Sequence, residues 1–230
     1  MFITLEGIDG CGKSTQSERL AKWLTEYTGH ETVRTYEPGG YRGGESLRKF
    51  ILESWNFCAK SELLLFLADR AEHVSKVIAP ALSDGRNVIC ERWNESTLAY
   101  QSGGHELRHD EVMSLIEACD FPEPDVKIFL DVEPEAALSR IRERTQSDKF
   151  EEEGLALMRK VAQSYRNMCR IECSATTPLP CVTPPLMRKE RGPGGEVASL
   201  HRLTRIDCGT LSEDEVFAAI IAEISAWRSR

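Results

Sequence analysis

The fold of this 230-residue chain is decided by its opening stretch, residues 2–15, which runs Phe2-Ile3-Thr4-Leu5-Glu6-Gly7-Ile8-Asp9-Gly10-Cys11-Gly12-Lys13-Ser14-Thr15. The run from Phe2 to Glu6 predicts a strand, and Gly7 to Ser14 fits the pattern G-x-x-x-x-G-K-[ST]. A helical pattern follows, so backbone N–H groups of the loop would surround phosphate oxygens at a helix N-terminus. A glycine-rich turn that merely starts a helix is the alternative, but both flanks favour a nucleoside triphosphate site.

The loop chemistry assigns roles to individual side chains. Lys13 is expected to reach the β- and γ-phosphates, and the Ser14 hydroxyl to bind Mg²⁺. The sequence has no N-K-x-D motif of the kind with which GTPases bind their base. A kinase of small acceptors instead needs a second pocket and a mobile cover with cations. The loop residues predicted to bind ATP in such a kinase are Gly7, Gly10, Cys11, Gly12, Lys13, Ser14 and Thr15.

Short apolar runs alternate with longer helical patterns along the chain, which is typical of a parallel α/β sheet. Strands are expected at about 2–6, 32–36, 87–91, 126–130 and 203–207. Helices are expected at about 13–29, 45–55, 61–82, 134–144 and 155–173, and after a capping box at Ser212 and Glu215. The run Leu63–Leu67 suggests a helix buried nearly all round. The predicted fold class is α/β: a P-loop NTPase-type parallel sheet of about five strands with helices on both faces.

Composition predicts one ordinary globular domain, residues 1–230. Hydrophobic residues make up 41% and charged residues 29%, which excludes a disordered chain. The net charge of −8 argues against non-specific nucleic-acid binding. With no apolar run near the ~18 residues of a membrane span and no signal peptide, we expect a cytoplasmic protein without membrane contact. Residues 174–200 hold five of the ten prolines and predict an exposed, mobile Pro/Gly-rich insertion.

The eight cysteines contain no C-x-x-C pair, and no secretion signal accompanies them. Cys169, Cys173 and Cys181 could share a metal ion, although their spacing does not match known zinc modules. Buried thiols that pack as small hydrophobic groups are the favoured interpretation.

Four segments supply the second pocket: Glu6–Thr15, Glu37-Pro38-Gly39-Gly40 with Leu47-Arg48, Phe66-Leu67-Ala68-Asp69-Arg70, and Glu91-Arg92-Trp93 leading into Ser96–Gln101. In their order and spacing the chain resembles the thymidylate kinase (dTMP kinase) family, in its bacterial form, over about residues 1–173 and again at the C-terminal strand and helix. The resemblance implies transfer of the γ-phosphoryl group of MgATP to dTMP, giving dTDP and ADP. It also implies a homodimer.

The acceptor pocket combines residue chemistry with this resemblance. Phe66 and Arg70 lie four residues apart, on one helix face; the resemblance implies that Phe66 stacks on thymine and Arg70 hydrogen-bonds a thymine carbonyl. Phe66 alone would more often be a core residue. Arg48 and Arg92 are expected to clamp the acceptor 5′-phosphate, with Arg92 at a strand end where ligands of such sheets bind.

The resemblance places three further side chains around the acceptor. Asp9 would accept a hydrogen bond from the 3′-hydroxyl, Tyr100 would lie beside C2′, and Gln101 would face the base edge. The predicted dTMP-binding residues are Asp9, Glu37, Arg48, Phe66, Arg70, Arg92, Thr97, Tyr100 and Gln101.

A metal ligand and a catalytic lid complete the predicted site. By the resemblance, Glu91 holds Mg²⁺ through water, and a lid at 145–153 carries Lys149 as a catalytic cation, since the loop has no Arg or Lys between Gly7 and Gly12. Arg140 and Arg144 are candidate ATP contacts, with a solvated helix face as the alternative. The predicted catalytic residues are Lys13, Arg92 and Lys149.

The sequence also departs from the family pattern. Tyr36 stands where the bacterial pattern usually has Arg, Glu91 replaces Asp, Trp93 replaces Tyr or His, and Lys149 replaces an Arg of bidentate geometry. Two alternatives stay open: a kinase of another deoxynucleoside monophosphate, and a nucleotide-binding regulatory protein with little turnover.

Overall fold

The computed structural model describes residues 1–53, 57–105, 107–145, 152–174 and 203–229. Within these ranges the strands form a parallel sheet in the order β2-β3-β1-β4-β5. The strands are β1 (Phe2–Glu6), β2 (Thr32–Tyr36), β3 (Asn87–Glu91), β4 (Val126–Asp131) and β5 (Leu203–Asp207). All five lie where the sequence predicts them, and β1, β3 and β4 are buried along their whole length.

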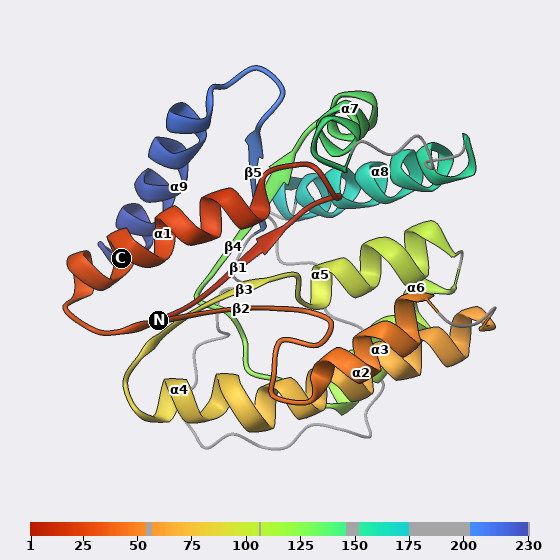
Figure 1. Ribbon diagram of the computed structural model, residues 1–230, viewed down its shortest axis with the longest axis horizontal. Coiled ribbons are helices and arrows are strands. Elements are labelled where there is room, and N and C mark those ends of the chain that lie inside the picture. Colours follow the sequence, from red (N-terminus) through yellow and green to blue (C-terminus); the bar gives the residue numbers. More distant parts are fainter. Residues whose placement is uncertain (54–56, 106, 146–151, 175–202, 230) are drawn as a thin grey trace.

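Helices connect and cover the strands on both faces of the sheet (Figure 1). The α-helices are α1 (Lys13–Thr28), α2 (Gly44–Glu53), α3 (Ala59–His73), α4 (Ala79–Ser83), α5 (Asn94–Thr97), α6 (His109–Ala118), α7 (Pro134–Thr145), α8 (Glu152–Ser174) and α9 (Glu213–Arg228). Two π-helical turns, η1 (Val74–Ile78) and η2 (Leu98–Gly104), continue α3 and α5. The predicted P-loop NTPase-type α/β class is confirmed.

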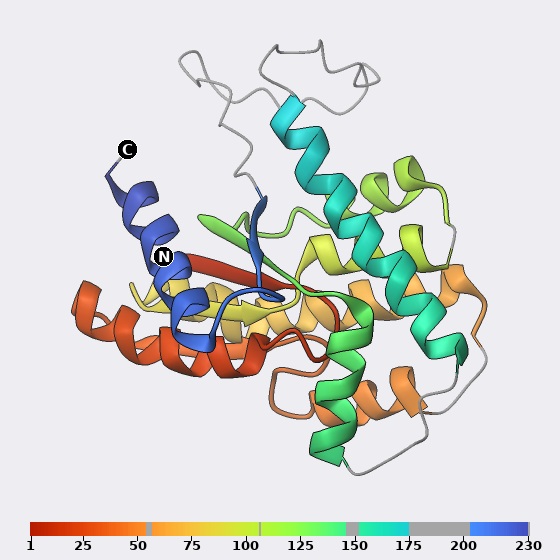
Figure 2. The same ribbon diagram turned by 90° about the horizontal axis from the view of Figure 1, so that it is seen from above.

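The connections place the helices in two layers. α1 and α9 pack together on one face, α1 against β1, β2 and β3 and α9 against β4 and β5. The chain returns from β2 to β3 through α2, α3 and α4, which lie on the opposite side of the sheet in Figure 1. The long helix α8, cyan in Figure 2, packs on β4, β5 and η2. Because every strand is parallel, all their carboxyl ends meet at one edge, where ligands of such sheets bind.

The structure corrects the prediction for the leucine run. Leu63 and Leu67 are buried in a cluster with Leu98, Val112 and Ile116, but Leu64 is 50% exposed. α3 is therefore buried on one face and not nearly all round. The five predicted helices and the capped C-terminal helix are present, whereas α5, η2 and α6 were not predicted. The capping box at Ser212 and Glu215 has both of its hydrogen bonds.

The prediction that the cysteines are buried is confirmed for four of the six whose burial the structure describes and wrong for the other two. The thiols of Cys11, Cys90, Cys169 and Cys208 are buried, but those of Cys58 and Cys119 are exposed. Cys173 and Cys181, two of the three candidate metal ligands, fall where the structure describes no side chain. The predicted insertion at 174–200 and most of the predicted lid at 145–153 also lie outside the described residues.

Candidate active site

The phosphate loop links the carboxyl end of β1 to the N-terminus of α1. Its three glycines have positive φ angles: 141° at Gly7, 80° at Gly10 and 100° at Gly12. A side chain at Gly10 would also place its Cβ 2.4 Å from the carbonyl oxygen of Ala137. Glycine is therefore required here for the backbone path and for close approach to α7.

A cavity of about 610 Å³ opens beside this loop. It is lined by loop residues on one side and by residues of β2, α2 and the end of β3 on the other. The lining residues are Asp9, Gly10, Gly12, Lys13, Ser14, Thr15, Arg34, Tyr36, Glu37, Arg48, Glu91, Arg92 and Ile141. Its walls thus combine a phosphate loop, three arginines and several carboxylates.

Lys13 lies folded back over its own loop. Its Nζ donates to the carbonyl oxygens of Gly7 and Ile8, each at 2.9 Å, and lies 4.0 Å from a carboxylate oxygen of Asp9. These partners are acceptors that a phosphate oxygen could replace with little movement of the lysine.

Two hydroxyls converge on the Glu91 carboxylate at the cavity floor. Ser14 donates to one oxygen at 2.7 Å and Ser17 to the other at 2.6 Å, while Arg34 approaches to 3.4 Å. Mg²⁺ prefers oxygen ligands and in such sites binds one or two carboxylates, waters and substrate phosphates. The Ser14 hydroxyl and Glu91 carboxylate, side by side next to the phosphate loop, fit that requirement. Sequence reasoning named Ser14 and Glu91 but missed Ser17, one helical turn after Ser14.

Arg92, the residue after β3, turns into the cavity with a φ angle of 75°, unusual for a side-chain-bearing residue. Its guanidinium donates to Asp9 at 2.7 Å and to the Tyr100 hydroxyl at 3.2 Å. Partial desolvation by the neighbouring protein atoms opposes ionisation of Asp9, but the charges of Arg92 and Lys13 outweigh this effect and lower the pKa of this carboxyl. Burial raises the pKa of Tyr100 despite the opposing charge of Arg92. A tyrosine hydroxyl and a carboxylate thus orient this arginine.

Arg48 approaches the same cavity from α2. It donates to the Pro38 carbonyl oxygen at 2.8 Å, and its guanidinium lies 5.5 Å from the ring centre of Tyr36. Arg34 and Tyr36 lie two residues apart on β2, and both line the cavity. This contribution of β2 was not predicted from the sequence. The period-2 spacing of these residues just before Glu37 could have indicated it.

Arg70 lies behind the cavity wall, fully buried. It donates to Glu37 at 2.7 Å, to Asn94 at 2.9 Å, to Thr97 at 3.0 Å and to the Trp93 carbonyl oxygen at 3.0 Å. Its guanidinium also lies 5.0 Å from the Trp93 ring centre. Arg70 therefore ties the end of β2 to the segment that follows Arg92.

The predicted acceptor residues separate into two groups. Asp9, Glu37, Arg48 and Arg92 line the cavity, whereas five others do not: Phe66, Arg70, Thr97, Tyr100 and Gln101. Tyr100 contacts the cavity through Arg92, Phe66 is half-buried on α3, and Gln101 donates to Glu62 at 3.0 Å.

The predicted ATP contacts of α7 and the lid are partly described. Arg140 donates to the Cys208 carbonyl oxygen at 3.1 Å. Lys149 and the side chain of Arg144 lie outside the described part of the chain.

Comparison with known proteins decides the family. The thymidylate kinase family model matches residues 5–177. A thymidylate kinase of Synechococcus sp. (strain JA-3-3Ab) is 44% identical over 173 residues, covering 75% of this chain and 83% of that protein. The chain belongs to the thymidylate kinase family.

Further members of the thymidylate kinase family agree. The thymidylate kinase of Prochlorococcus marinus (strain MIT 9312) is 40% identical over 178 residues, with 74% of this chain and 83% of that protein covered. A crystal structure of thymidylate kinase from Ehrlichia chaffeensis is 28% identical, covers 98% of both chains and superposes with a TM-score of 0.69. Among the described residues, no helix has the length and apolar character needed to cross a membrane.

Proposed function

We propose that this chain transfers the γ-phosphoryl group of MgATP to the 5′-phosphate of dTMP, giving dTDP and ADP. Family membership supports the reaction. The observation that carries the proposal is the cavity in which the phosphate loop faces Arg48 and Arg92. One side can hold a triphosphate, and the other offers two forked cations to a second phosphate.

The donor half of the reaction belongs to the phosphate loop. Loop N–H groups and Lys13 would bind the β- and γ-phosphates, with Lys13 exchanging the carbonyl oxygens of Gly7 and Ile8 for phosphate oxygens. Ser14 and Glu91 would hold Mg²⁺, Glu91 through water. Bound Mg²⁺ would supply positive charge to the transferring phosphoryl group.

The acceptor half belongs to the opposite wall. Arg48 and Arg92 would clamp the 5′-phosphate in line with the γ-phosphoryl group, so that transfer proceeds without a covalent enzyme intermediate. Asp9 would accept a hydrogen bond from the 3′-hydroxyl, and Tyr100 would stand beside C2′. The other residues predicted to bind dTMP are Glu37, Phe66, Arg70, Thr97 and Gln101.

Other parts of the proposal rest on the sequence and the family. Lys149 would supply a catalytic cation from the lid, and Arg140 and Arg144 would contact ATP. The chain would work as a single kinase domain in a cytoplasmic homodimer, with the 174–200 segment as an insertion that takes no part in catalysis.

An ADP-release assay with a panel of nucleoside monophosphates tests the function. Rapid turnover selective for dTMP is expected. If the enzyme prefers another deoxynucleoside monophosphate, that nucleotide and not dTMP is the acceptor. If the chain binds nucleotide without turnover, it is a regulatory protein and not a kinase.

A further inference from the structure

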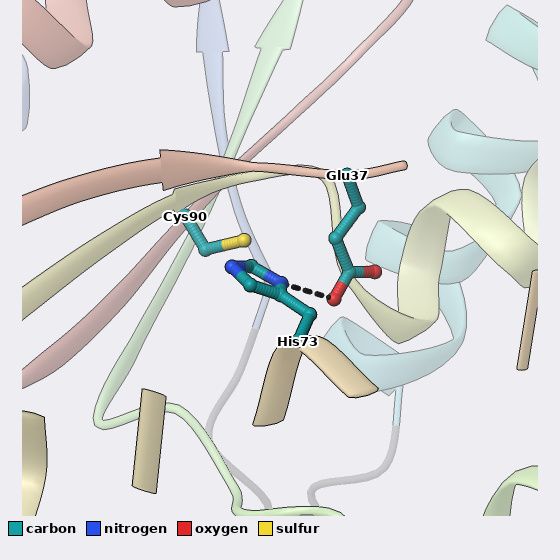
Figure 3. Close-up of side chains that lie close together, drawn as sticks. All are labelled: Glu37, His73 and Cys90. Atoms are coloured by element: carbon teal, nitrogen blue, oxygen red, sulfur yellow. Dashed lines mark hydrogen bonds and ion pairs between the residues drawn. The ribbon is translucent and has the colours of Figure 1, made fainter. Parts of the chain in front are cut away.

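A buried histidine lies directly behind the acceptor wall. The Nδ1 atom of His73 lies 2.9 Å from Oε1 of Glu37, and its Nε2 atom lies 2.6 Å from the Thr35 hydroxyl. Figure 3 shows the ring beside the Glu37 carboxylate, with the Cys90 thiol on its other side. His73 is completely buried and Glu37 nearly so, yet Glu37 lines the cavity.

The partners of Glu37 fix the direction of this hydrogen bond. Arg70 donates its Nε–H to the other carboxylate oxygen at 2.7 Å, and an arginine is always charged in proteins. Paired in this way, Glu37 is a carboxylate, which can only accept hydrogen bonds. The proton between His73 and Glu37 therefore sits on Nδ1 of His73.

Glu37 connects His73 to the segment that carries Arg92. The four hydrogen bonds of Arg70 run from Glu37 to Asn94, Thr97 and the Trp93 carbonyl oxygen, just after Arg92. We propose that His73 is a positioning residue for the acceptor: its Nδ1–H holds Glu37, and through Arg70 the segment after Arg92, in the geometry that binds the monophosphate. This inference rests on the proposed function of the same cavity.

A metal ion is the competing explanation for this cluster. Glu37, His73 and Cys90 are all buried and offer ligand atoms within 4.8 Å of one another. Metals bind the thiolate form of cysteine, whereas the Cys90 thiol already donates a hydrogen bond to the carbonyl oxygen of Arg92 at 3.2 Å. The second oxygen of Glu37 already faces the permanent charge of Arg70. The hydrogen bonds from Arg70 and from Nδ1–H of His73 account for both carboxylate oxygens of Glu37 without a metal ion.

Two variants of His73 test the roles of its two ring nitrogens separately. The side-chain amide nitrogen of Asn stands close to the place of Nδ1, and that of Gln close to the place of Nε2. His73→Asn can therefore keep the donor to Glu37, whereas His73→Gln keeps a partner for Thr35 and loses that donor. Both remove the ring from the same buried site, so each is the packing control of the other.

The measurement is steady-state kinetics with dTMP and ATP varied separately, together with melting temperatures. His73→Gln removes a hydrogen bond to a charged group, and the loss of such a bond should raise KM for dTMP by about 10-fold or more. KM for ATP should change by less than about 3-fold. His73→Asn should stay within about 3-fold of wild type for both substrates. Equal KM changes in the two variants, or a parallel rise for ATP, would reduce His73 to a packing residue.

Two measurements on the unmodified protein cover the case in which neither variant folds. In long-range ¹H–¹⁵N spectra of backbone-assigned, ¹⁵N-histidine-labelled protein, Nδ1 of His73 should carry a proton. An unprotonated Nδ1, or one zinc ion per chain in the purified protein, would overturn the proposal. Because these measurements do not depend on turnover, they also distinguish a failure of this inference from a wild-type protein that does not phosphorylate dTMP.

Discussion

The cavity wall and the network behind it use their charged groups in opposite ways. At the wall, Asp9 is 72% exposed and Arg34 is 41% exposed, and Lys13 donates to two loop carbonyl oxygens whose place phosphate oxygens could take. Behind the wall, Arg70 and His73 are almost without solvent, and Glu37 is held from two sides. The first region keeps its charges available for phosphates, whereas the second uses its charges to hold the wall in place. Substitutions in the two regions should therefore damage different properties.

The largest effect should come from Arg70→Ala. Removing one partner of a buried ion pair leaves Glu37 without its main counter-charge and typically costs ~3–5 kcal/mol of folding free energy. Denaturant unfolding measures this loss. Arg108→Ala is the matched control, because Arg108 forms an exposed ion pair with Asp110 and its loss should leave the unfolding midpoint unchanged. An Arg70→Ala protein as stable as wild type would show that the network does not support the wall.

Lys13→Ala should damage activity and leave stability almost intact. Loss of a preorganised charge at the transferring group lowers kcat by ~10²–10³-fold or more. The melting temperature should change little, because the bonds of Lys13 serve its own loop. Coupled assays of ADP release and a thermal melt measure both quantities. More than about a tenth of wild-type activity would contradict the role of the loop.

Arg92→Ala should give a smaller loss that is specific for the acceptor. A lost charge-assisted hydrogen bond costs ~1.5–3 kcal/mol, which corresponds to roughly 10- to 150-fold in kcat/KM for dTMP. Every monophosphate in an acceptor panel should be affected alike, since the contact is with phosphate and not with the base. A loss confined to dTMP would move Arg92 from the phosphate to the base side.

Glu6 directly precedes the phosphate loop but is completely buried, as the charged groups behind the cavity wall are. Burial, reinforced by Glu95, raises the pKa of Glu6 from 4.5 to about 7. Between these values the folded chain binds more protons than the unfolded chain, so the contribution of Glu6 to stability falls as the pH rises from about 4.5 to about 7. Relative to wild type, Glu6→Gln should gain a few degrees of melting temperature over this window. If the melting temperatures of wild type and Glu6→Gln change in parallel from pH 4.5 to 8, the raised pKa of Glu6 is contradicted.

The same contrast separates what the sequence could predict from what it could not. The strands and the phosphate loop depend on near neighbours: an apolar run, glycines at fixed spacing and a lysine before a serine. The exposure of Leu64 depends on which face of α3 meets α6, and no local pattern contains that information. Likewise Arg70 could be placed on the helix face of Phe66, but its partners Glu37, Asn94 and Thr97 come from segments brought together only by folding. α6 did carry a local signal, with Asp110 and Glu111 in its first turn and Val112 and Ile116 on one face.

The winding of η2 has a consequence for how this site can change over evolution. A π-helix bonds residue i to residue i+5 and so holds an extra residue in its turn. In η2 this wide turn directs Tyr100 toward Arg92, while Gly103 lies so close to α8 that a Cβ there would stand 2.5 Å from Ser164 Cβ. The loss or gain of one residue between Tyr100 and Gly103 would rotate Tyr100 about the helix axis by about 100° relative to Gly103. Deletions and insertions in this turn are therefore far harder to tolerate than substitutions, because the spacing itself aims the tyrosine.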